Sequence, residues 1–140
     1  MIIKIKLNEG AKVPVKATTG SAGYDIFAAE EPTIIDKFVE YKTGFFLDIP
    51  YGFYASIVPR SSISMYDLVM CNAPGTIDSD YRGEILIRFK LIDDRKYIYK
   101  KGDRIAQMII HECCDLDFLE VEELSTIGLT RAGGFGSTGK

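Results

Sequence analysis

Residues 84–92 read EILIRFKLI, and their alternation predicts a β-strand with one buried face. Large apolar side chains recur at every second position, whereas the charged Arg88 and Lys90 fall between them. Successive side chains of a strand point to opposite faces, so a period of two places one set in a core and the other in solvent. The set expected in the core is Ile85, Ile87, Phe89 and Leu91.

The same kind of pattern recurs along the chain. Residues 3–7 and 53–58 repeat the period of two, and residues 104–110 are mostly apolar on both faces, which indicates a more deeply buried strand. Turn-forming residues separate these segments, and no long stretch has a sustained helical period. We therefore expect a single all-β domain, a barrel or a sandwich, over residues 1–127.

The composition is that of an ordinary globular domain without a strong electrostatic field. The 140 residues are 46% hydrophobic and 26% charged, and the 17 basic and 20 acidic residues give a net charge of −3. Both signs are spread along the chain without blocks. This argues against a general nucleic-acid or membrane-surface binder, so an anionic ligand would need a local cluster of donors.

The cysteines and the apolar segments indicate the cellular compartment in which the protein is expected. The three cysteines are odd in number and lack CxxC spacing, which predicts neither a disulfide framework nor a zinc site. No apolar run approaches the roughly 18 residues that span a bilayer, and residues 1–6 alternate where a signal peptide would be continuously apolar. We expect a cytoplasmic protein that is not secreted, or one in the nucleus or host-cell cytosol if a virus encodes it.

The densest cluster of reactive side chains is residues 75–84, GTIDSDYRGE, just before a predicted strand. An Asp at a strand end could accept a proton from an attacking water, as phosphoryl chemistry at neutral pH requires. Carboxylates are the better candidates for this step because His111 is the only histidine. The alternative is a solvated turn in which Asp78 and Asp80 only cap the backbone.

Three shorter segments offer groups that could bind a polyphosphate or its metal. Arg60, followed by the hydroxyls of Ser61 and Ser62, could meet phosphate oxygens through parallel hydrogen bonds, or could be a surface arginine beside a helix N-cap. Asp25 lies two residues after Gly23 and could hold a metal through water or lie in a turn. Gln107 lies in an apolar run and needs a partner, either a phosphate or a neighbouring strand.

Residues 128–140 form a glycine-rich tail in which the apolar alternation stops. Such a segment cannot pack a core. It could be a frayed terminus. It could also close over a phosphate-bearing ligand, because glycine lets backbone N–H groups come close.

Together and in this order, these segments resemble the motifs of the trimeric dUTPase family. The motifs appear as residues 22–26 (AGYDI), 59–62 (PRSS), 72–84 (NAPGTIDSDYRGE), 102–107 (GDRIAQ) and 133–139 (GGFGSTG). The resemblance implies a jelly-roll-like fold assembled as a homotrimer, with each active site built from all three subunits. It also implies magnesium-dependent hydrolysis of dUTP to dUMP and pyrophosphate, which limits uracil incorporation into DNA and supplies dUMP for dTTP synthesis.

The resemblance further implies a role for each motif. Asp78 would be the general base for the water that attacks the α-phosphorus, and Tyr81 would stack under the deoxyribose and exclude a 2′-hydroxyl. Asp25 would help to hold Mg²⁺ through water. The residues expected to bind the uracil are Asn72, Gly75, Thr76, Ile77 and Phe135. Those expected elsewhere on the substrate, chiefly at its phosphates, are Arg60, Ser61, Ser62, Gln107, Arg131, Gly136, Ser137 and Thr138.

Two departures from the family pattern keep alternatives open. Residues 131–135 (RAGGF) are one residue shorter than the usual Arg-x-x-Gly-Gly-Phe, and Ser62 stands where glycine is common. The related dCTP deaminases also carry Arg-Ser-Ser, but they use a glutamate where this sequence has Asp78. A nucleotide-sensing or partner-binding protein on the same scaffold would be expected to lose a catalytic group. A plain structural β-barrel would not need so many polar residues at matched positions.

Overall fold

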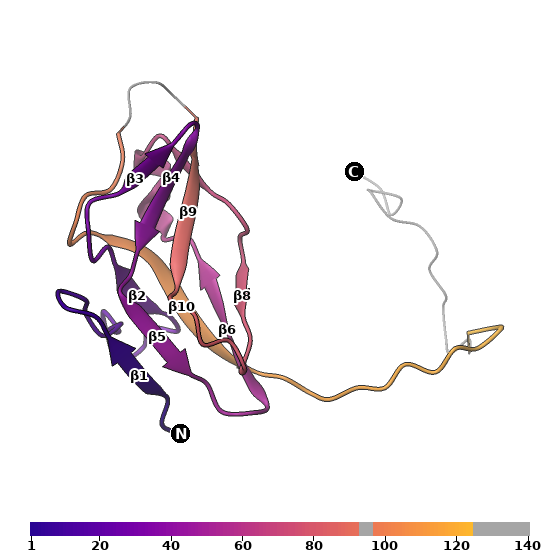
Figure 1. The fold of residues 1–140 in the computed structure, drawn as a ribbon. Helices are drawn as coiled ribbons and strands as arrows, with labels where there is room; N and C mark the ends of the chain where they lie inside the picture. Colours follow the sequence, from indigo (N-terminus) through magenta and orange to yellow (C-terminus); the bar gives the residue numbers. More distant parts are fainter. Residues whose placement is uncertain (93–96, 125–140) are drawn as a thin grey trace.

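The computed structural model describes residues 1–92 and 97–124, and its regular elements are almost all β-strands (Figure 1). In chain order they are β1 (Lys4–Leu7), β2 (Tyr24–Phe27), β3 (Thr33–Ile35), β4 (Phe38–Lys42), β5 (Phe45–Asp48), β6 (Phe53–Val58), the 3-10 helix η1 (Ser61–Met65), β7 (Leu68–Met70), β8 (Gly75–Ile77), β9 (Leu86–Leu91) and β10 (Arg104–Glu112). The all-β prediction is confirmed. Across these described stretches, the chain forms no helix that is long and apolar enough to cross a membrane.

The strands pair antiparallel in open sheets. Two sheets have four strands each, in the orders β2-β10-β6-β8 and β3-β4-β9-β7, and β1 pairs with β5 in a third. None of the sheets closes into a barrel within the described residues. Of the two expected arrangements, the structure therefore has packed open sheets, as in a sandwich.

One hydrophobic core joins the sheets, and β9 contributes to it as its alternation predicts. Ile85, Ile87 and Phe89 are at most 3% exposed and Leu91 is partly buried, whereas Arg88 and Lys90 are exposed. The strand begins at Leu86 and not at residue 84, because Ile85 already pairs outside it, donating its N–H to the Phe45 carbonyl. Val39 and Tyr41 of β4, which pairs with β9, also belong to this core. The β2-β10-β6-β8 sheet adds side chains that include Ile26, Ala55 and Ile105.

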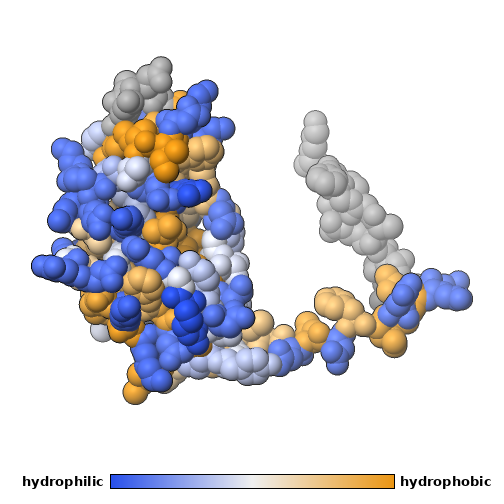
Figure 2. Space-filling view, in the orientation of Figure 1, coloured by the Kyte–Doolittle hydropathy of each residue, from blue (hydrophilic) through white to orange (hydrophobic). Residues whose placement is uncertain are grey.

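Residues 113–124 leave the sheets after β10 as an extended segment (Figure 1). Its apolar side chains are exposed, with Phe118 at 98% and Leu119 at 85%. Figure 2 shows hydrophobic residues along this segment, away from the body of the molecule. Exposed apolar stretches of this kind mark surfaces for association. The boundary expected between residues 127 and 128, and the glycine-rich tail after it, lie outside the described residues.

Candidate active site

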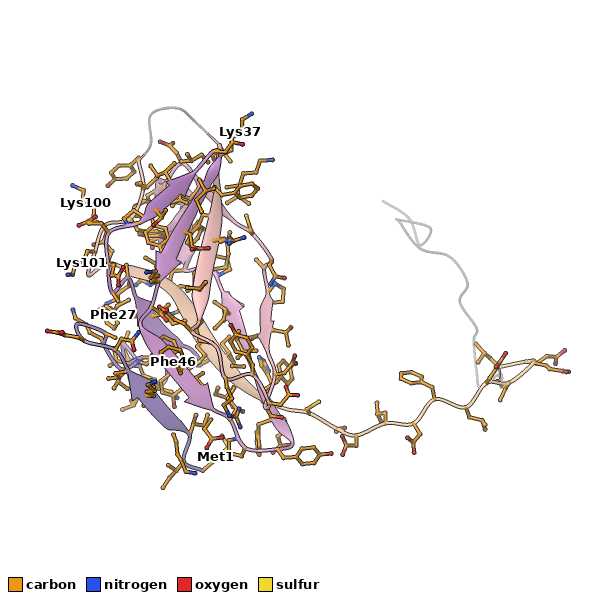
Figure 3. The ribbon with its side chains drawn as sticks, viewed as in Figure 1. Met1, Phe27, Lys37, Phe46, Lys100 and Lys101 are labelled. Atoms are coloured by element: carbon orange, nitrogen blue, oxygen red, sulfur yellow. The ribbon has the colours of Figure 1, made fainter. Side chains whose placement is uncertain are left out.

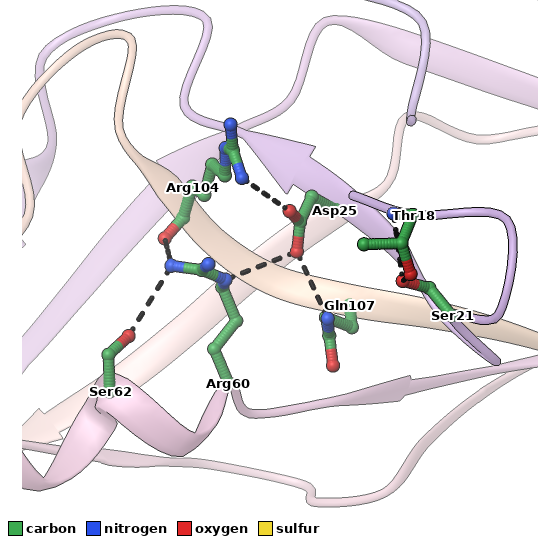
Figure 4. Close-up of polar contacts among 7 residues, drawn as sticks. All are labelled: Thr18, Ser21, Asp25, Arg60, Ser62, Arg104 and Gln107. Carbon is green, nitrogen blue, oxygen red and sulfur yellow. Dashed lines mark hydrogen bonds and ion pairs between the residues drawn. The ribbon is translucent and has the colours of Figure 1, made fainter. Parts of the chain in front are cut away.

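Asp25 is the centre of a polar cluster on the β2-β10-β6-β8 sheet (Figure 4). It lies within β2 and not in a turn, and it is 1% exposed. Its Oδ1 accepts hydrogen bonds from Arg60 Nε and Gln107 Nε2, both at 3.1 Å. Its Oδ2 accepts one from Arg104 Nη1, also at 3.1 Å. Both oxygens of this buried carboxylate thus accept hydrogen bonds from protein donors, two of which are cationic.

The sheet register explains why these side chains meet. Gln107 on β10 lies opposite Asp25 on β2 and opposite Val58 on β6, so the three residues form one row across the sheet. Arg60 follows Val58 by two residues and lies just before η1, and its side chain reaches Asp25 in this row. A Cβ added at Gly23 would lie 3.2 Å from Gln107 Cβ, so only glycine leaves this glutamine its full space.

Arg104 was not assigned a role from the sequence, and a β-bulge brings it to Asp25. Residues three apart on a regular strand point to opposite faces, which would separate Arg104 from Gln107. The pairing of β10 with β2 shifts by one residue between Arg104 and Ala106. An extra residue of this kind re-aims the side chain. Arg104 then reaches Asp25 while its guanidinium lies 6.0 Å from the ring centre of Phe27, at the end of β2 (Figure 3).

The charges of this cluster favour an anion. One carboxylate faces two guanidinium groups, and the Arg60 and Arg104 side chains are 27% and 47% exposed, so part of each remains open to a ligand. Arg60 Nη1 also makes long hydrogen bonds, at 3.4 Å, to Ser62 Oγ and the Arg104 carbonyl. A fork of donors with excess positive charge suits phosphate oxygens.

The same donors leave little for a directly bound metal ion. Within the described ranges, no three His, Cys, Asp or Glu side chains come together as metal ligands. Both oxygens of Asp25 already accept from protein donors. These residues therefore fit Mg²⁺ only as part of a magnesium–triphosphate complex, whose phosphates supply oxygen ligands.

A second group of predicted residues lines an open pocket of about 450 Å³ beside the loop that joins β7 to β8. Asn72, Gly75, Thr76 and Ile77 lie along it. Asn72 has φ 54°, a left-handed conformation that asparagine tolerates better than most residues. A Cβ at Gly75 would lie 3.1 Å from the Asn72 carbonyl oxygen, so glycine permits a tight loop between β7 and β8. This loop thus forms part of the pocket wall.

Asp78 and Tyr81 follow β8 in an exposed turn. The Tyr81 N–H donates to the Asp78 carbonyl at 3.2 Å, and Tyr81 Oη donates to the Glu84 carbonyl at 3.0 Å. Arg82 pairs with Asp48 at 2.8 Å. The Asp78 carboxylate is exposed and forms no ion pair with any described residue. The turn expected as the alternative is present, and it leaves this carboxylate accessible.

The structure therefore brings the predicted residues together in two groups. Asp25, Arg60, Ser62 and Gln107 form the first, with Ser61 exposed at the start of η1. The second group contains the pocket residues Asn72, Gly75, Thr76 and Ile77, together with Asp78 and Tyr81. No hydrogen bond or ion pair among the described residues joins the two groups. The residues predicted in the tail lie outside the described part of the chain: Arg131, Phe135, Gly136, Ser137 and Thr138.

Comparison with known proteins identifies the family. The model of the dUTPase family matches residues 9–139. The chain belongs to the dUTPase family. A deoxyuridine 5′-triphosphate nucleotidohydrolase of Hydrogenobaculum is 41% identical to it over 137 residues, 96% of this chain and 94% of the relative.

Solved dUTPases share the fold. The dUTPase of Staphylococcus bacteriophage 80alpha with dUPNHPP superposes with a TM-score of 0.84 at 28% identity, covering 99% of this chain and 98% of the phage chain. A mutant dUTPase from phage phi11 of S. aureus, whose structure concerns the coordination of a structural Mg(II) ion, has a TM-score of 0.74 at 26% identity and covers 88% and 98% of the two chains. The dUTPase resemblance seen in the motifs is thus confirmed over nearly the whole chain.

His111, the only histidine of this dUTPase-family chain, lies near the end of β10. Its Nε2 and the Ser56 hydroxyl are 2.8 Å apart, and its ring stacks on Tyr54 with centres 5.0 Å apart. A serine beside a histidine is the start of a nucleophile–base arrangement, which also needs a group to orient the base. No carboxylate among the described residues contacts this histidine. The pair therefore has the character of a structural contact.

Proposed function

We propose that the protein is a dUTP diphosphatase, which hydrolyses dUTP to dUMP and pyrophosphate in the cytosol. The observation that carries the proposal is the family match over residues 9–139, which spans every residue given a role above. The relative from Hydrogenobaculum is named for this reaction, and the 80alpha enzyme was solved with dUPNHPP. Three free cysteines are compatible with a reducing compartment.

In this proposal the Asp25 cluster binds the triphosphate. Arg60 and Gln107 meet phosphate oxygens, with Ser61 and Ser62 adding hydroxyl donors at the start of η1. Asp25 holds Arg60 and Gln107 at fixed positions, because its carboxylate accepts from both at 3.1 Å. Donors fixed before the substrate arrives need no reorganisation during the reaction.

Magnesium belongs in this scheme to the substrate, a magnesium–dUTP complex. When bound, the ion neutralises charge on the phosphates and favours departure of pyrophosphate. The net positive charge of Arg60 and Arg104 beside one carboxylate suits the remaining negative charge of such a complex. Asp25 can face a metal-bound water only through the lone pairs that its protein donors leave free.

The pocket beside the β7–β8 loop is the proposed uracil site. Backbone groups of residues 72–77 would pair with the base, so cytosine would present the wrong donors and acceptors. Asp78 would take a proton from a water molecule while the water oxygen forms a bond to the α-phosphorus. The bond from that phosphorus to the leaving pyrophosphate oxygen breaks in the same step. Tyr81 would lie against the deoxyribose and leave no room for a 2′-hydroxyl.

We place the two groups of one active site on different subunits of a homotrimer. The pocket residues with Asp78 and the cluster around Asp25 share no hydrogen bond within the described chain, which supports completion by a second copy. The exposed Phe118 and Leu119 after β10 are suited to packing on such a copy. The tail of a third subunit, with Phe135 on the base and Arg131, Gly136, Ser137 and Thr138 at the phosphates, would close the site.

Release of pyrophosphate from dUTP, compared with dCTP, dTTP and UTP, tests this proposal. We expect release from dUTP alone, dependent on Mg²⁺ and abolished by a chelator. A Lys90→Arg variant is a matched control that should release pyrophosphate as the wild type does, since Lys90 lies on the exposed face of β9 outside the residues that line the pocket. Formation of dUTP from dCTP would instead favour a deaminase. Binding of dUTP without release would favour a nucleotide sensor.

A further inference from the structure

The Tyr81 side chain is 43% exposed, yet its ring has a defined place in the turn after β8. The ring folds back along the chain, and Tyr81 Oη donates to the Glu84 carbonyl at 3.0 Å. A Cβ added at Gly83 would lie 2.3 Å from Tyr81 Oη and 2.5 Å from Tyr81 Cζ. The ring therefore fills the space that a side chain at residue 83 would need, and only glycine allows this ring position.

The carbonyl that holds the ring belongs to a residue whose side chain is itself anchored. Glu84 Oε1 accepts a hydrogen bond from the Gly44 N–H at 2.9 Å, although the two residues are 40 positions apart. Gly44 lies between β4 and β5, and its own carbonyl accepts from the Asn8 N–H at 2.8 Å. A carboxylate is a stronger acceptor than a neutral group. The Glu84 side chain thus ties the end of the Tyr81 turn to a well-anchored turn.

The residue after Glu84 is held at the same place. Thr43 Oγ1 donates to the Ile85 carbonyl at 2.7 Å, and the Ile85 N–H donates to the Phe45 carbonyl at 3.1 Å. Thr43 and Ile85 are each 1% exposed, so this contact lies in the core. Hydrogen bonds from residues 84 and 85 therefore fasten the Tyr81 turn to the β4–β5 turn.

A fixed ring matters for selection of the sugar. In the proposed site Tyr81 lies against the deoxyribose and leaves no room for a 2′-hydroxyl. Exclusion by a clash works only while the blocking group cannot yield. Exposed side chains otherwise change rotamer within picoseconds to nanoseconds. A partly exposed tyrosine therefore needs its own attachment if it is to reject a ribonucleotide.

We propose that Glu84 is a positioning residue for sugar specificity: its carboxylate, bound to the Gly44 N–H, fixes the Glu84 carbonyl, and this carbonyl holds the Tyr81 ring over Gly83 so that the site rejects UTP. This inference rests on the proposed dUTP site and adds the groups that keep its sugar-facing ring in place. Glu84 and Gly83 contact no substrate atom in this scheme.

The kcat/KM for dUTP divided by the kcat/KM for UTP tests the proposal, because a general structural loss would lower both values alike. We expect Glu84→Ala to lower this ratio about five- to tenfold, chiefly by a lower KM for UTP. Glu84→Gln should keep the wild-type ratio, since its amide oxygen can accept from the Gly44 N–H. Gly83→Ala should lower the ratio as well, because its Cβ displaces the Tyr81 ring and leaves the Glu84 side chain intact.

Asp67→Ala is the matched control. Asp67 Oδ2 accepts from the Tyr97 N–H at 2.9 Å, and the two residues are 30 positions apart. This variant therefore also removes a carboxylate that holds a distant backbone N–H, but at a position without a proposed role in the site. We expect it to lower the Tm about as much as Glu84→Ala and to leave the dUTP-to-UTP ratio unchanged.

A double-mutant cycle with Tyr81→Phe shows whether Glu84 acts through the ring. Tyr81→Phe removes the hydroxyl that the Glu84 carbonyl holds, so Glu84→Ala should not change the ratio further in that background. Additive effects in the cycle, an unchanged ratio in Glu84→Ala, or an equal fall of the ratio in Asp67→Ala would each overturn the proposal.

Two further outcomes keep the test decisive. If Glu84→Ala does not fold, Gly83→Ala decides, and an unchanged ratio in that variant would overturn the proposal. Any of these contrary results, obtained with a wild-type protein that hydrolyses dUTP, rejects this inference and leaves the proposed function in place. A wild-type protein that does not hydrolyse dUTP would reject the proposed function, and this inference with it.

Discussion

Replacing Asp25 by asparagine keeps the size of the side chain and removes the charge on which the phosphate-binding cluster converges. Asp25 accepts three hydrogen bonds, from Arg60, Gln107 and Arg104, each at 3.1 Å. Asparagine has one oxygen to accept with, and its amide nitrogen would face a donor of the protein. At least one of the three donors therefore loses its partner, and both guanidinium groups lose their counter-charge.

The loss of stability in Asp25→Asn depends on the burial of Asp25 and on the partial exposure of its two arginine partners. Removing one partner of a fully buried ion pair costs about 3–5 kcal/mol. Here only Asp25 is fully buried, while the Arg60 and Arg104 side chains are 27% and 47% exposed and can be rehydrated. We therefore expect Asp25→Asn to lower the free energy of unfolding by about 2 kcal/mol. Displacement of Arg60 should lower kcat/KM for dUTP about a hundredfold.

Urea unfolding and pyrophosphate release measure the two effects, and Asp48→Asn is the control for stability. Asp48 also has two cationic partners, Lys4 at 3.3 Å and Arg82 at 2.8 Å, but its side chain is 45% exposed. Its replacement should cost less than about 1 kcal/mol. Equal losses of stability in the two variants, or undiminished kcat/KM in Asp25→Asn, would refute the view that the buried carboxylate organises the site.

Four further predictions address the chemistry, the assembly and the core. Asp78→Asn should abolish turnover and leave dUPNHPP affinity largely intact, because the base is lost and the shape kept; full turnover would remove Asp78 as the base. Deleting residues 133–140 should cost most of the turnover rate without changing the Tm, whereas an undiminished rate would make the tail dispensable. Refolding an equal mixture of Asp78→Asn and Arg60→Ala subunits should restore about a quarter of wild-type activity. Each site takes Asp78 from one subunit and Arg60 from another, and each of these groups is intact in half of the subunits. No recovery of activity would place both groups of a site on one subunit. Burial raises the pKa of Tyr41. Urea unfolding should therefore show the full contribution of Tyr41 to the free energy of unfolding below about pH 10, and a decrease at higher pH, because Tyr41 loses its proton first in the unfolded chain. A pH profile equal to that of Tyr41→Phe would contradict this.

Much of the local structure follows from side-chain patterns that act over a few residues. The alternation in residues 84–92 identifies the buried face of β9 because opposite faces of a strand meet different surroundings. Segment 75–84 is recognisable because its turn residues and carboxylates are contiguous. The choice between a closed barrel and open sheets was not predictable, since it depends on which strands pair across long separations, as β4 does with β9.

The partners of Asp25 show the same division within the site. The sequence alone determined that Asp25, Arg60 and Gln107 are candidates for one site, because their types and their motifs are local properties of the chain. Only the tertiary structure decided that Asp25 is buried and that Arg104 joins it through a bulge in β10. Burial and bulge register arise from contacts between strands far apart in sequence, and they determine which of the available charges meet.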